Sequence, residues 1–194
     1  MDGNALYLVR HGESEWNLAG RIQGQSVRSG GLTPMGRSQA ARTAEELALR
    51  APGARWIVAS DLVRARETAE IIAARLGLPV SVDAEFREQN LGEYEGNSFA
   101  AEHGTGTWQD VIDKLWRQPG TQPPGGESIV QLYQRVHRAL RRHAREQAEI
   151  IVVTHGGAVR MASAATPPEP GRPMLRAVVD NASVTEWRVP CPVS

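Results

Sequence analysis

Cysteine and long apolar runs are both scarce in this chain, and each scarcity excludes a class of protein. Cys191 is the only cysteine among the 194 residues, so the chain cannot form an internal disulfide, and a reducing, cytoplasmic location is expected. No apolar stretch approaches the ~20 residues that span a bilayer, so we expect neither a membrane anchor nor an export segment.

Net charge is lacking as well. The 22 basic residues balance 22 acidic ones, which leaves no overall field to attract nucleic acid or a membrane surface. Lys114 is the only lysine, and a GC-rich coding sequence explains this bias, although arginine is also the better phosphate ligand. Apolar residues make up 41% and charged residues 23%, which is typical of a globular protein. The length predicts a single domain over residues 1–194.

Short apolar stretches alternate with helical periodicity along most of the chain. Five of them are predicted strands: 5–9, 56–59, 78–82, 149–154 and 184–189. The first predicted helix begins at Thr33 and Pro34, the second at Ser60 and Asp61, and the third near Glu127. Their expected apolar faces are, in order, Ala40, Ala44, Leu47 and Ala48; Leu62, Ala65, Ala69, Ile72, Ala73 and Leu76; and Ile129, Leu132, Tyr133, Val136 and Leu140.

This alternation predicts a three-layer α/β/α sandwich with a mainly parallel central sheet. Residues 100–126 interrupt it with many glycines and prolines around a helical piece at 108–116, and we interpret them as a small lid-like excursion. Residues 165–173 form a second irregular stretch. The third helix carries arginines at 135, 138, 141, 142 and 145, which are expected to be solvated; without an aromatic platform they do not predict nucleic-acid binding.

Two predicted strands end in the same way. YLVRHG at 7–12 and VVTHGG at 152–157 are both apolar strands followed by His-Gly. A single histidine after a strand is usually a turn residue, but the carboxyl ends of parallel strands border one crevice, so His11 and His155 are expected to face each other there. Gly12 and Gly156 would let the backbone approach a ligand closely.

Two arginines join the histidines at this edge. Arg10 precedes His11, and Arg64 lies one turn into the second predicted helix. Guanidinium groups match phosphate oxygens in geometry and charge, so the cluster predicts a phosphate-sized positive pocket. Taken alone, Arg64 would instead be expected to form a salt bridge with Asp61 or Glu67.

At this point the chain resembles a known family, the histidine phosphatase superfamily, also called phosphoglycerate mutase-like. The resemblance covers nearly the whole chain, and a lone Arg-His-Gly would be a weak signal beside the ordered set of motifs. The matching segments are LVRHGESEWN, GRIQGQ, LTPMGRSQA, SDLVRARETAE, FREQNLGEYEG, GGES, VVTHGGAVR and DNASVTEW.

The resemblance implies a mechanism and a set of site residues. It makes His11 the nucleophile that becomes a covalent phosphohistidine and Glu88 the proton donor. It implies no metal and no cofactor, because fixed cations stabilise the charge on the phosphoryl oxygens. The groups implied to bind phosphate or substrate are Arg10, Asn17, Arg21, Gln23, Gly24, Arg64, His155 and Gly156. For attack, one nitrogen of His11 must be unprotonated, so its other nitrogen is expected to donate to a backbone carbonyl or a carboxylate.

Departures from the family pattern indicate the branch. The cofactor-dependent mutases typically carry Glu-Arg-His-Tyr-Gly and a downstream lysine, but here the segment is Glu-Gln-Asn-Leu-Gly at 88–92, with Phe99 at the lysine position. The chain therefore resembles the phosphatase-type branch, a metal-independent phosphomonoester hydrolase. Between Gly24 and Leu32 the loop QSVRSGG is about two residues longer than usual and lacks the customary aspartate, which leaves the substrate open.

Several alternatives stay open at this stage. The expected substrate is a small phosphorylated metabolite: a sugar phosphate, a phosphoglycerate derivative or a nucleotide. A mutase and a regulatory phosphatase acting on protein are the enzyme alternatives, and a binding module without catalysis is disfavoured because all four key residues are present. The sequence leaves a homodimer open. The candidate specificity segments are 22–32, 94–126 and 164–178.

Some individual side chains have weaker predictions. Arg172 and Arg176 could reach a second anionic group of the substrate, with a surface position as the alternative. Trp108 and Trp116 are expected in the core rather than against the substrate. Solvent exposure is expected for Arg28, His103, His137 and His143.

Overall fold

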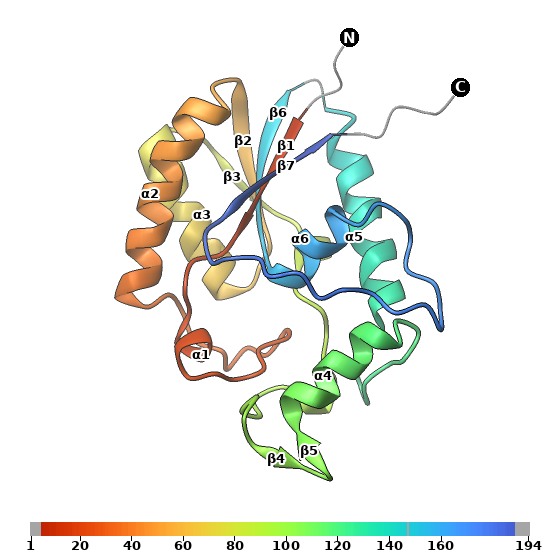
Figure 1. The fold of residues 1–194 in the computed structure, drawn as a ribbon. Helices are drawn as coiled ribbons and strands as arrows, with labels where there is room; N and C mark the ends of the chain where they lie inside the picture. Colours follow the sequence, from red (N-terminus) through yellow and green to blue (C-terminus); the bar gives the residue numbers. More distant parts are fainter. Residues whose placement is uncertain (1–4, 147, 189–194) are drawn as a thin grey trace, which may run out of the picture.

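The computed structural model describes residues 5–146 and 148–188, and Cys191 and the end of the last predicted strand, at residue 189, lie outside this range. A five-stranded sheet forms the centre in the order β3-β2-β6-β1-β7. β1, β2, β3 and β6 are parallel, and β7 runs antiparallel beside β1 (Figure 1). The strands are β1 Ala5–Arg10, β2 Ala54–Ala59, β3 Val80–Val82, β6 Glu149–Thr154 and β7 Val184–Arg188.

Helices cover both faces of this sheet, which confirms the predicted three-layer sandwich. α2 and α3 pack on one face, and α5 and α6 pack on the other (Figure 1). α1 and α4 lie beyond the carboxyl ends of β1 and β6. The helices are α1 Glu15–Leu18, α2 Pro34–Arg50, α3 Val63–Leu76, α4 Trp108–Arg117, α5 Ile129–His143 and α6 Gly156–Ala162, with 3-10 turns η1 Ala84–Phe86 and η2 Gly92–Tyr94.

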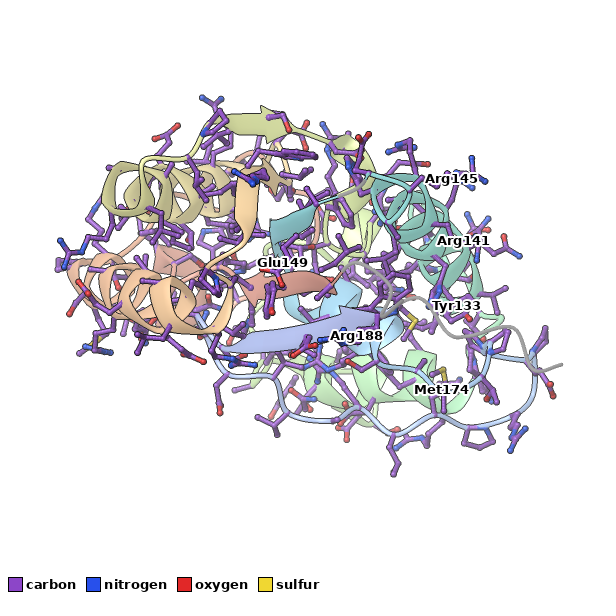
Figure 2. All side chains as sticks on the ribbon, turned by 90° about the horizontal axis from the view of Figure 1, so that it is seen from above. Tyr133, Arg141, Arg145, Glu149, Met174 and Arg188 are labelled. Atoms are coloured by element: carbon purple, nitrogen blue, oxygen red, sulfur yellow. The ribbon has the colours of Figure 1, made fainter. Side chains whose placement is uncertain are left out.

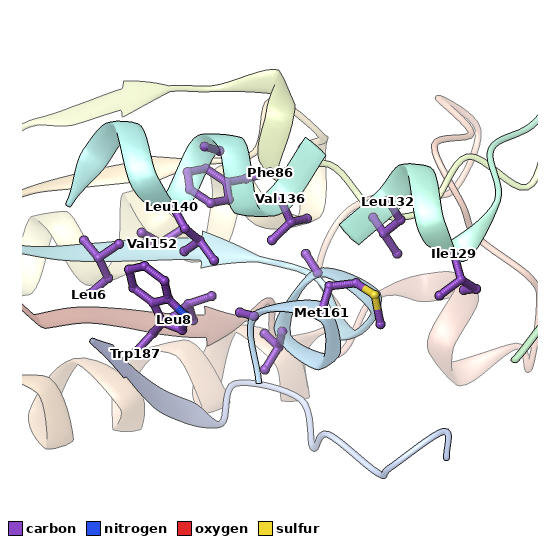
Figure 3. Close-up of a cluster of buried hydrophobic side chains, with 14 of the residues drawn as sticks. Leu6, Leu8, Phe86, Ile129, Leu132, Val136, Leu140, Val152, Met161 and Trp187 are labelled. Carbon is purple, nitrogen blue, oxygen red and sulfur yellow. The ribbon is translucent and has the colours of Figure 1, made fainter. Parts of the chain in front are cut away.

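Alternating side chains of each buried strand enter two separate cores. On β1, Leu6 and Leu8 face α5 and α6, while Tyr7 and Val9 face α2 and α3. Figure 3 shows the first of these cores, where Phe86 and Leu140 pack over the strands. The central strands are thus buried on both faces, as their continuously apolar sequences predict.

The predicted N-cap residue is found at the start of α2 but not at the start of α3. Thr33 caps α2, where its side chain accepts from the N–H of Gly36, as predicted. Ser60 and Asp61 do not cap α3: this helix begins at Val63 after Leu62, without a side-chain cap. Ala48 was expected on the buried face of α2 but is exposed.

The arginine face of α5 is only partly solvated. Arg141 and Arg145 extend outward from the helix (Figure 2). Arg138 and Arg142 instead pair with Glu85 at 2.6 Å. Two of the arginines that the sequence predicted to be solvated therefore form ion pairs with a carboxylate instead.

Arg135 is the least exposed of these arginines, with 15% of its side chain accessible. It donates to the carbonyls of Glu85, Arg87 and Glu88 at 2.6, 3.0 and 3.2 Å and pairs with Glu127. Arg135 therefore joins α5 to the segment that carries Glu88.

Two of the three histidines expected in solvent are not exposed. His137 is 8% exposed, and its Nε2 lies 2.9 Å from the carbonyl of Met161. His143 lies half-buried, 2.9 Å from Asp83. His103 is exposed as predicted and stacks on Trp108 at 3.9 Å between ring centroids.

The excursion at 100–126 holds a short hairpin and a helix. Strands β4 (Glu102–His103) and β5 (Gly106–Thr107) pair with each other, and α4 follows within two residues of the predicted bounds. Ile112 and Trp116 of α4 are buried against the core below α5. Among the described residues, every helix is too short or too polar to cross a bilayer.

Candidate active site

A pocket opens at the carboxyl ends of the parallel strands. These strand ends lie at the lower edge of the sheet in Figure 1. The pocket brings together side chains from β1, α1, the 20–24 loop, α3, α4 and α6, together with Glu88 and Arg176 from connecting segments. The predicted residues that line it are Arg10, His11, Asn17, Arg21, Gln23, Gly24, Arg64, Glu88 and Gly156. The rings of His11 and His155 lie edge to face, 5.1 Å apart between centroids, so the two His-Gly strand ends do meet.

His11 is held as a neutral imidazole whose Nε2 carries no proton. Its Nδ1 lies 2.7 Å from the carbonyl of Gly12, and a carbonyl only accepts, so Nδ1 carries the proton. This is the acceptor that the sequence could not name. Burial lowers the pKa of His11 well below 6.5, and the charges of Arg64 and Arg10 lower it further. Nε2 therefore has an available lone pair at neutral pH.

Arg64 reaches that same nitrogen. It is 1% exposed, and its Nε donates to His11 Nε2 at 3.2 Å. The other guanidinium nitrogens donate to the carbonyl of Gly24 at 2.8 Å and to Ser29 Oγ at 2.9 Å. Burial lowers the pKa of Arg64 to about 10, so it stays charged at neutral pH.

The predicted alternative for Arg64, a salt bridge, is wrong. Asp61 pairs with Arg87, and Glu67 accepts from Arg37 at 3.2 Å. Both acids therefore have other partners, and the Arg64 guanidinium points into the pocket.

Two buried nitrogens at the pocket lack hydrogen-bond partners within the described chain, one on the lining residue Arg10 and one on His155, which is fully buried and does not itself line the pocket. Arg10 Nη1 donates to the carbonyl of Val179, but Arg10 Nε has no partner there. His155 Nε2 lies 2.8 Å from Ser60 Oγ, and His155 Nδ1 has none. Arg10 Nε is a donor, and a buried donor without an acceptor is costly, so it favours an anion with several acceptor oxygens. His155 Nδ1 is a second donor in the tautomer in which Ser60 Oγ donates to Nε2.

Glu88 is held against the start of α6. Its Oε2 accepts from the N–H of Gly157 at 3.0 Å, and its Oε1 accepts from the N–H of Gln89 at 2.8 Å. A Cβ on residue 157 would lie 2.0 Å from Glu88 Oε1, so only glycine at that position leaves room for the carboxylate. The carboxylate is thus fixed at the pocket wall opposite the cations.

Polar residues in and after α1 form another part of the pocket lining. Ser14 caps α1, with Asn17 Oδ1 accepting from its backbone N–H at 3.2 Å. Gln23 Oε1 accepts from Ser14 Oγ at 2.9 Å. Asn17 is therefore both a cap residue of α1 and a residue of the pocket lining. Arg21 lies at the exposed rim, where it donates to the carbonyl of Gly96 at 2.8 Å.

The match with known families agrees with this geometry. The model of the histidine phosphatase superfamily (branch 1) matches residues 6–190. The chain belongs to the histidine phosphatase superfamily. The resemblance inferred from the motifs is confirmed, and so is the prediction of an enzyme of the phosphoric monoester hydrolase type acting on a small phosphorylated metabolite.

Its relatives in the superfamily include both mutase-like proteins and phosphatases. Phosphoglycerate mutase-like protein 4 of Arabidopsis thaliana is 37% identical over 97% of this chain and 81% of its own length. Glucosyl-3-phosphoglycerate phosphatase of Mycolicibacterium vanbaalenii is 36% identical over 82% of this chain and 72% of its own. The solved structure of a mycobacterial glucosyl-3-phosphoglycerate phosphatase with VO3 has a TM-score of 0.78 at 29% identity, covering 94% of this chain and 90% of that one.

Sequence reasoning missed several residues of this histidine phosphatase pocket. Ser29 and Ser60 bind Arg64 and His155, but the first lies in an irregular loop and the second resembled a helix cap. Arg160 lines the pocket, and its position five residues after His155, one turn into α6, was an available signal.

Residues outside the motifs divide between the pocket and the surface. Arg176 lines the pocket, as one of its two interpretations allowed, whereas Arg172 is exposed and lies elsewhere. Arg28 is exposed, as expected. Trp116 is 4% exposed and belongs to the core, as predicted, while also forming part of the pocket wall.

Proposed function

We propose that the chain hydrolyses phosphomonoesters through a phosphohistidine on His11. The observation that carries this proposal is the convergence of the unprotonated His11 Nε2 with Arg64, which donates to it, with the unpartnered Nε of Arg10 and with the ring of His155. The lone pair attacks phosphorus, and the donors bind the three non-bridging oxygens, whose charge they stabilise.

Glu88 supplies the proton transfers in this proposal. As the bond from phosphorus to the ester oxygen breaks, Glu88 donates a proton to the leaving alkoxide. Water then attacks the phosphohistidine, Glu88 takes a proton from it, and the bond from phosphorus to Nε2 breaks to release inorganic phosphate. Its contact with Gly157 supports the role, because it holds the carboxylate beside the phosphate-binding groups.

Hydrolysis is favoured over mutase chemistry by the segment after Glu88. Gln89 and Asn90 stand where the mutases carry basic residues, and both side chains bind the local backbone: Gln89 donates to the carbonyl of Glu127 at 2.9 Å, and Asn90 accepts from the N–H of Gly92 at 2.9 Å. The position of the mutase lysine is Phe99. Water rather than a second substrate oxygen is therefore proposed as the acceptor.

A small substrate is favoured over a phosphorylated protein. His11 is 2% exposed and His155 is fully buried, so the phosphate must enter a deep site. A side chain of a folded protein would need a wide, exposed crevice. Phosphoglycerate derivatives stand first among the candidates, because a similar protein is a glucosyl-3-phosphoglycerate phosphatase.

Release of inorganic phosphate from a panel of phosphomonoesters tests the proposal. The panel contains 3-phosphoglycerate, sugar phosphates, nucleoside monophosphates and p-nitrophenyl phosphate, with EDTA present. Within the described part of the chain no group of three or more His, Cys, Asp or Glu side chains could hold a metal ion, so activity should survive the chelator. His11→Ala should lower turnover by several orders of magnitude, and His103→Gln, on the exposed hairpin, is the matched control.

Two outcomes would contradict this assignment. Release that survives His11→Ala would exclude the phosphohistidine route. Movement of phosphate between positions of phosphoglycerate without release would favour a mutase.

Three further expectations belong to the proposal: a cytoplasmic location, one domain over residues 1–194, and a lid at 100–126. The sequence leaves a homodimer open, and light scattering would distinguish it from a monomer.

A further inference from the structure

The pocket contains more positive charge than one phosphate requires. Its charged lining comprises one carboxylate, on Glu88, and five guanidiniums, on Arg10, Arg21, Arg64, Arg160 and Arg176. A phosphomonoester brings about two negative charges, and uncompensated buried charge is costly. The excess lies on the side of α6, where Arg160 and Arg176 approach the pocket.

Arg160 is half-buried and has no carboxylate partner within the described residues. Its Nε donates to the carbonyl of Ala177 at 2.6 Å, and its guanidinium lies 5.5 Å from the centroid of the Trp116 ring. Burial, with a smaller contribution from the charges of Arg176 and Arg10, lowers its pKa to about 10, while the charge of Glu88 acts in the opposite direction. A charged group in this setting is stabilised by any anion that enters.

Arg176 approaches the same region from the irregular segment after α6. Its guanidinium lies 5.8 Å from the centroid of the Phe99 ring, and its Nη1 contacts Asp113 at 3.2 Å. Asp113 is partly exposed, so it compensates the charge only in part. Both arginines are thus positioned on aromatic rings, which reduces the entropy lost when they bind a ligand.

The distance from the phosphate site is short. A Cβ placed on Gly156 would lie 3.1 Å from Arg160 Nη1 and 3.5 Å from Arg10 Nε, the unpaired phosphate donor. Both nitrogens therefore approach one point on the pocket wall. A second anionic group a few bonds from the phosphate ester would reach Arg160.

We infer that Arg160 and Arg176 form a second anion subsite, which selects phosphomonoesters that carry a carboxylate or a second phosphate near the scissile group. The inference rests on the proposed hydrolase function and specifies its substrate class. A carboxylate or phosphate oxygen would accept from Arg160 and Arg176 while the scissile phosphate occupies the site at His11.

Matched substrate pairs test the subsite. The carboxylate pair is 3-phosphoglycerate with glycerol 3-phosphate, and the phosphate pair is fructose 1,6-bisphosphate with fructose 6-phosphate. In the wild type, kcat/KM should be at least tenfold higher for the member with the extra anion in one of the pairs, and that pair identifies the anion. Arg160→Gln should reduce this preference by about 10- to 100-fold, the value of one hydrogen bond between charged groups.

The controls separate a selective subsite from a general effect on catalysis. Arg172 lies in the same segment as Arg176 but outside the pocket, so Arg172→Gln should leave the preference unchanged. Arg160→Lys keeps the positive charge and should retain part of the preference that Arg160→Gln loses. If Arg160→Gln fails to fold, Arg176→Gln provides the same measurement. An equal loss on both members of each pair would overturn the inference, as would a wild type without preference. Absence of release from every substrate, p-nitrophenyl phosphate included, would instead refute the hydrolase proposal.

Discussion

Acidification should destabilise this protein through the two histidines of its phosphate site. Burial, and then nearby guanidiniums, holds the pKa of His11 and of His155 well below 6.5. At pH 5.5 both are therefore neutral in the folded protein, whereas a histidine of the unfolded chain, with a pKa of about 6.5, is mostly protonated. The unfolded state then binds more protons, so the free energy of unfolding falls as the pH drops below 6.5.

The expected size follows from this difference. One pH unit below 6.5, a histidine that stays neutral in the folded protein lowers the free energy of unfolding by about 1 kcal/mol relative to high pH, and the pair by about 2 to 3 kcal/mol. Urea unfolding followed by tryptophan fluorescence at pH 8 and pH 5.5 measures the change. Buffers must be free of phosphate, which would stabilise the folded state by binding.

Variants isolate the contribution of the site. His11→Ala should reduce the pH-dependent change by about half, because one of the two neutral buried imidazoles is removed. His103→Gln removes an exposed histidine and should leave the change as in the wild type. Equal free energies of unfolding at the two pH values in the wild type would refute the reasoning. So would the same pH dependence in His11→Ala as in the wild type.

Two catalytic predictions concern the carboxylate at the pocket wall. Glu88→Gln should slow hydrolysis of alkyl phosphates by about 10²- to 10⁴-fold but affect p-nitrophenyl phosphate much less, since that leaving group needs little protonation; equal losses in parallel assays would remove Glu88 from the acid role. Gly157→Ala should displace Glu88, because the added Cβ would lie 2.0 Å from its Oε1, and so lower kcat for alkyl phosphates by about 10²-fold with little change in thermal stability. A kcat equal to that of the wild type would show that the carboxylate does not need this position.

The sequence predicted the layers well, and also that the two His-Gly strand ends meet, because both depend on local patterns. Strands buried on both faces are continuously apolar, and His11 and His155 follow two of them directly. The topology of a parallel sheet then brings the strand ends together. That one nitrogen of His11 is unprotonated while the other donates could also be anticipated, but only the structure shows that the donor is Nδ1.

What the sequence missed depends on contacts between distant segments. Serine is a favourable N-cap residue, but the hydroxyl of Ser60 forms a hydrogen bond with His155, which lies 95 residues away in the sequence. His137 lies on a helix rich in arginine, which predicted exposure, but it is buried and its Nε2 donates a hydrogen bond to the carbonyl of Met161. Arg160 lies over the ring of Trp116, which belongs to the excursion at 100–126. No periodicity within one element encodes such partners.

Arg135 has a consequence for how loss-of-function variants of this protein are interpreted. It lies on α5 and is absent from the pocket lining, yet three carbonyls between Glu85 and Glu88 depend on its guanidinium. A genetic screen for inactive variants should therefore recover substitutions at 135 beside those at 11 and 88. Such a substitution would inactivate the protein by displacing the segment that carries Glu88. Loss of activity in a variant therefore does not show that the substituted residue contacts the substrate.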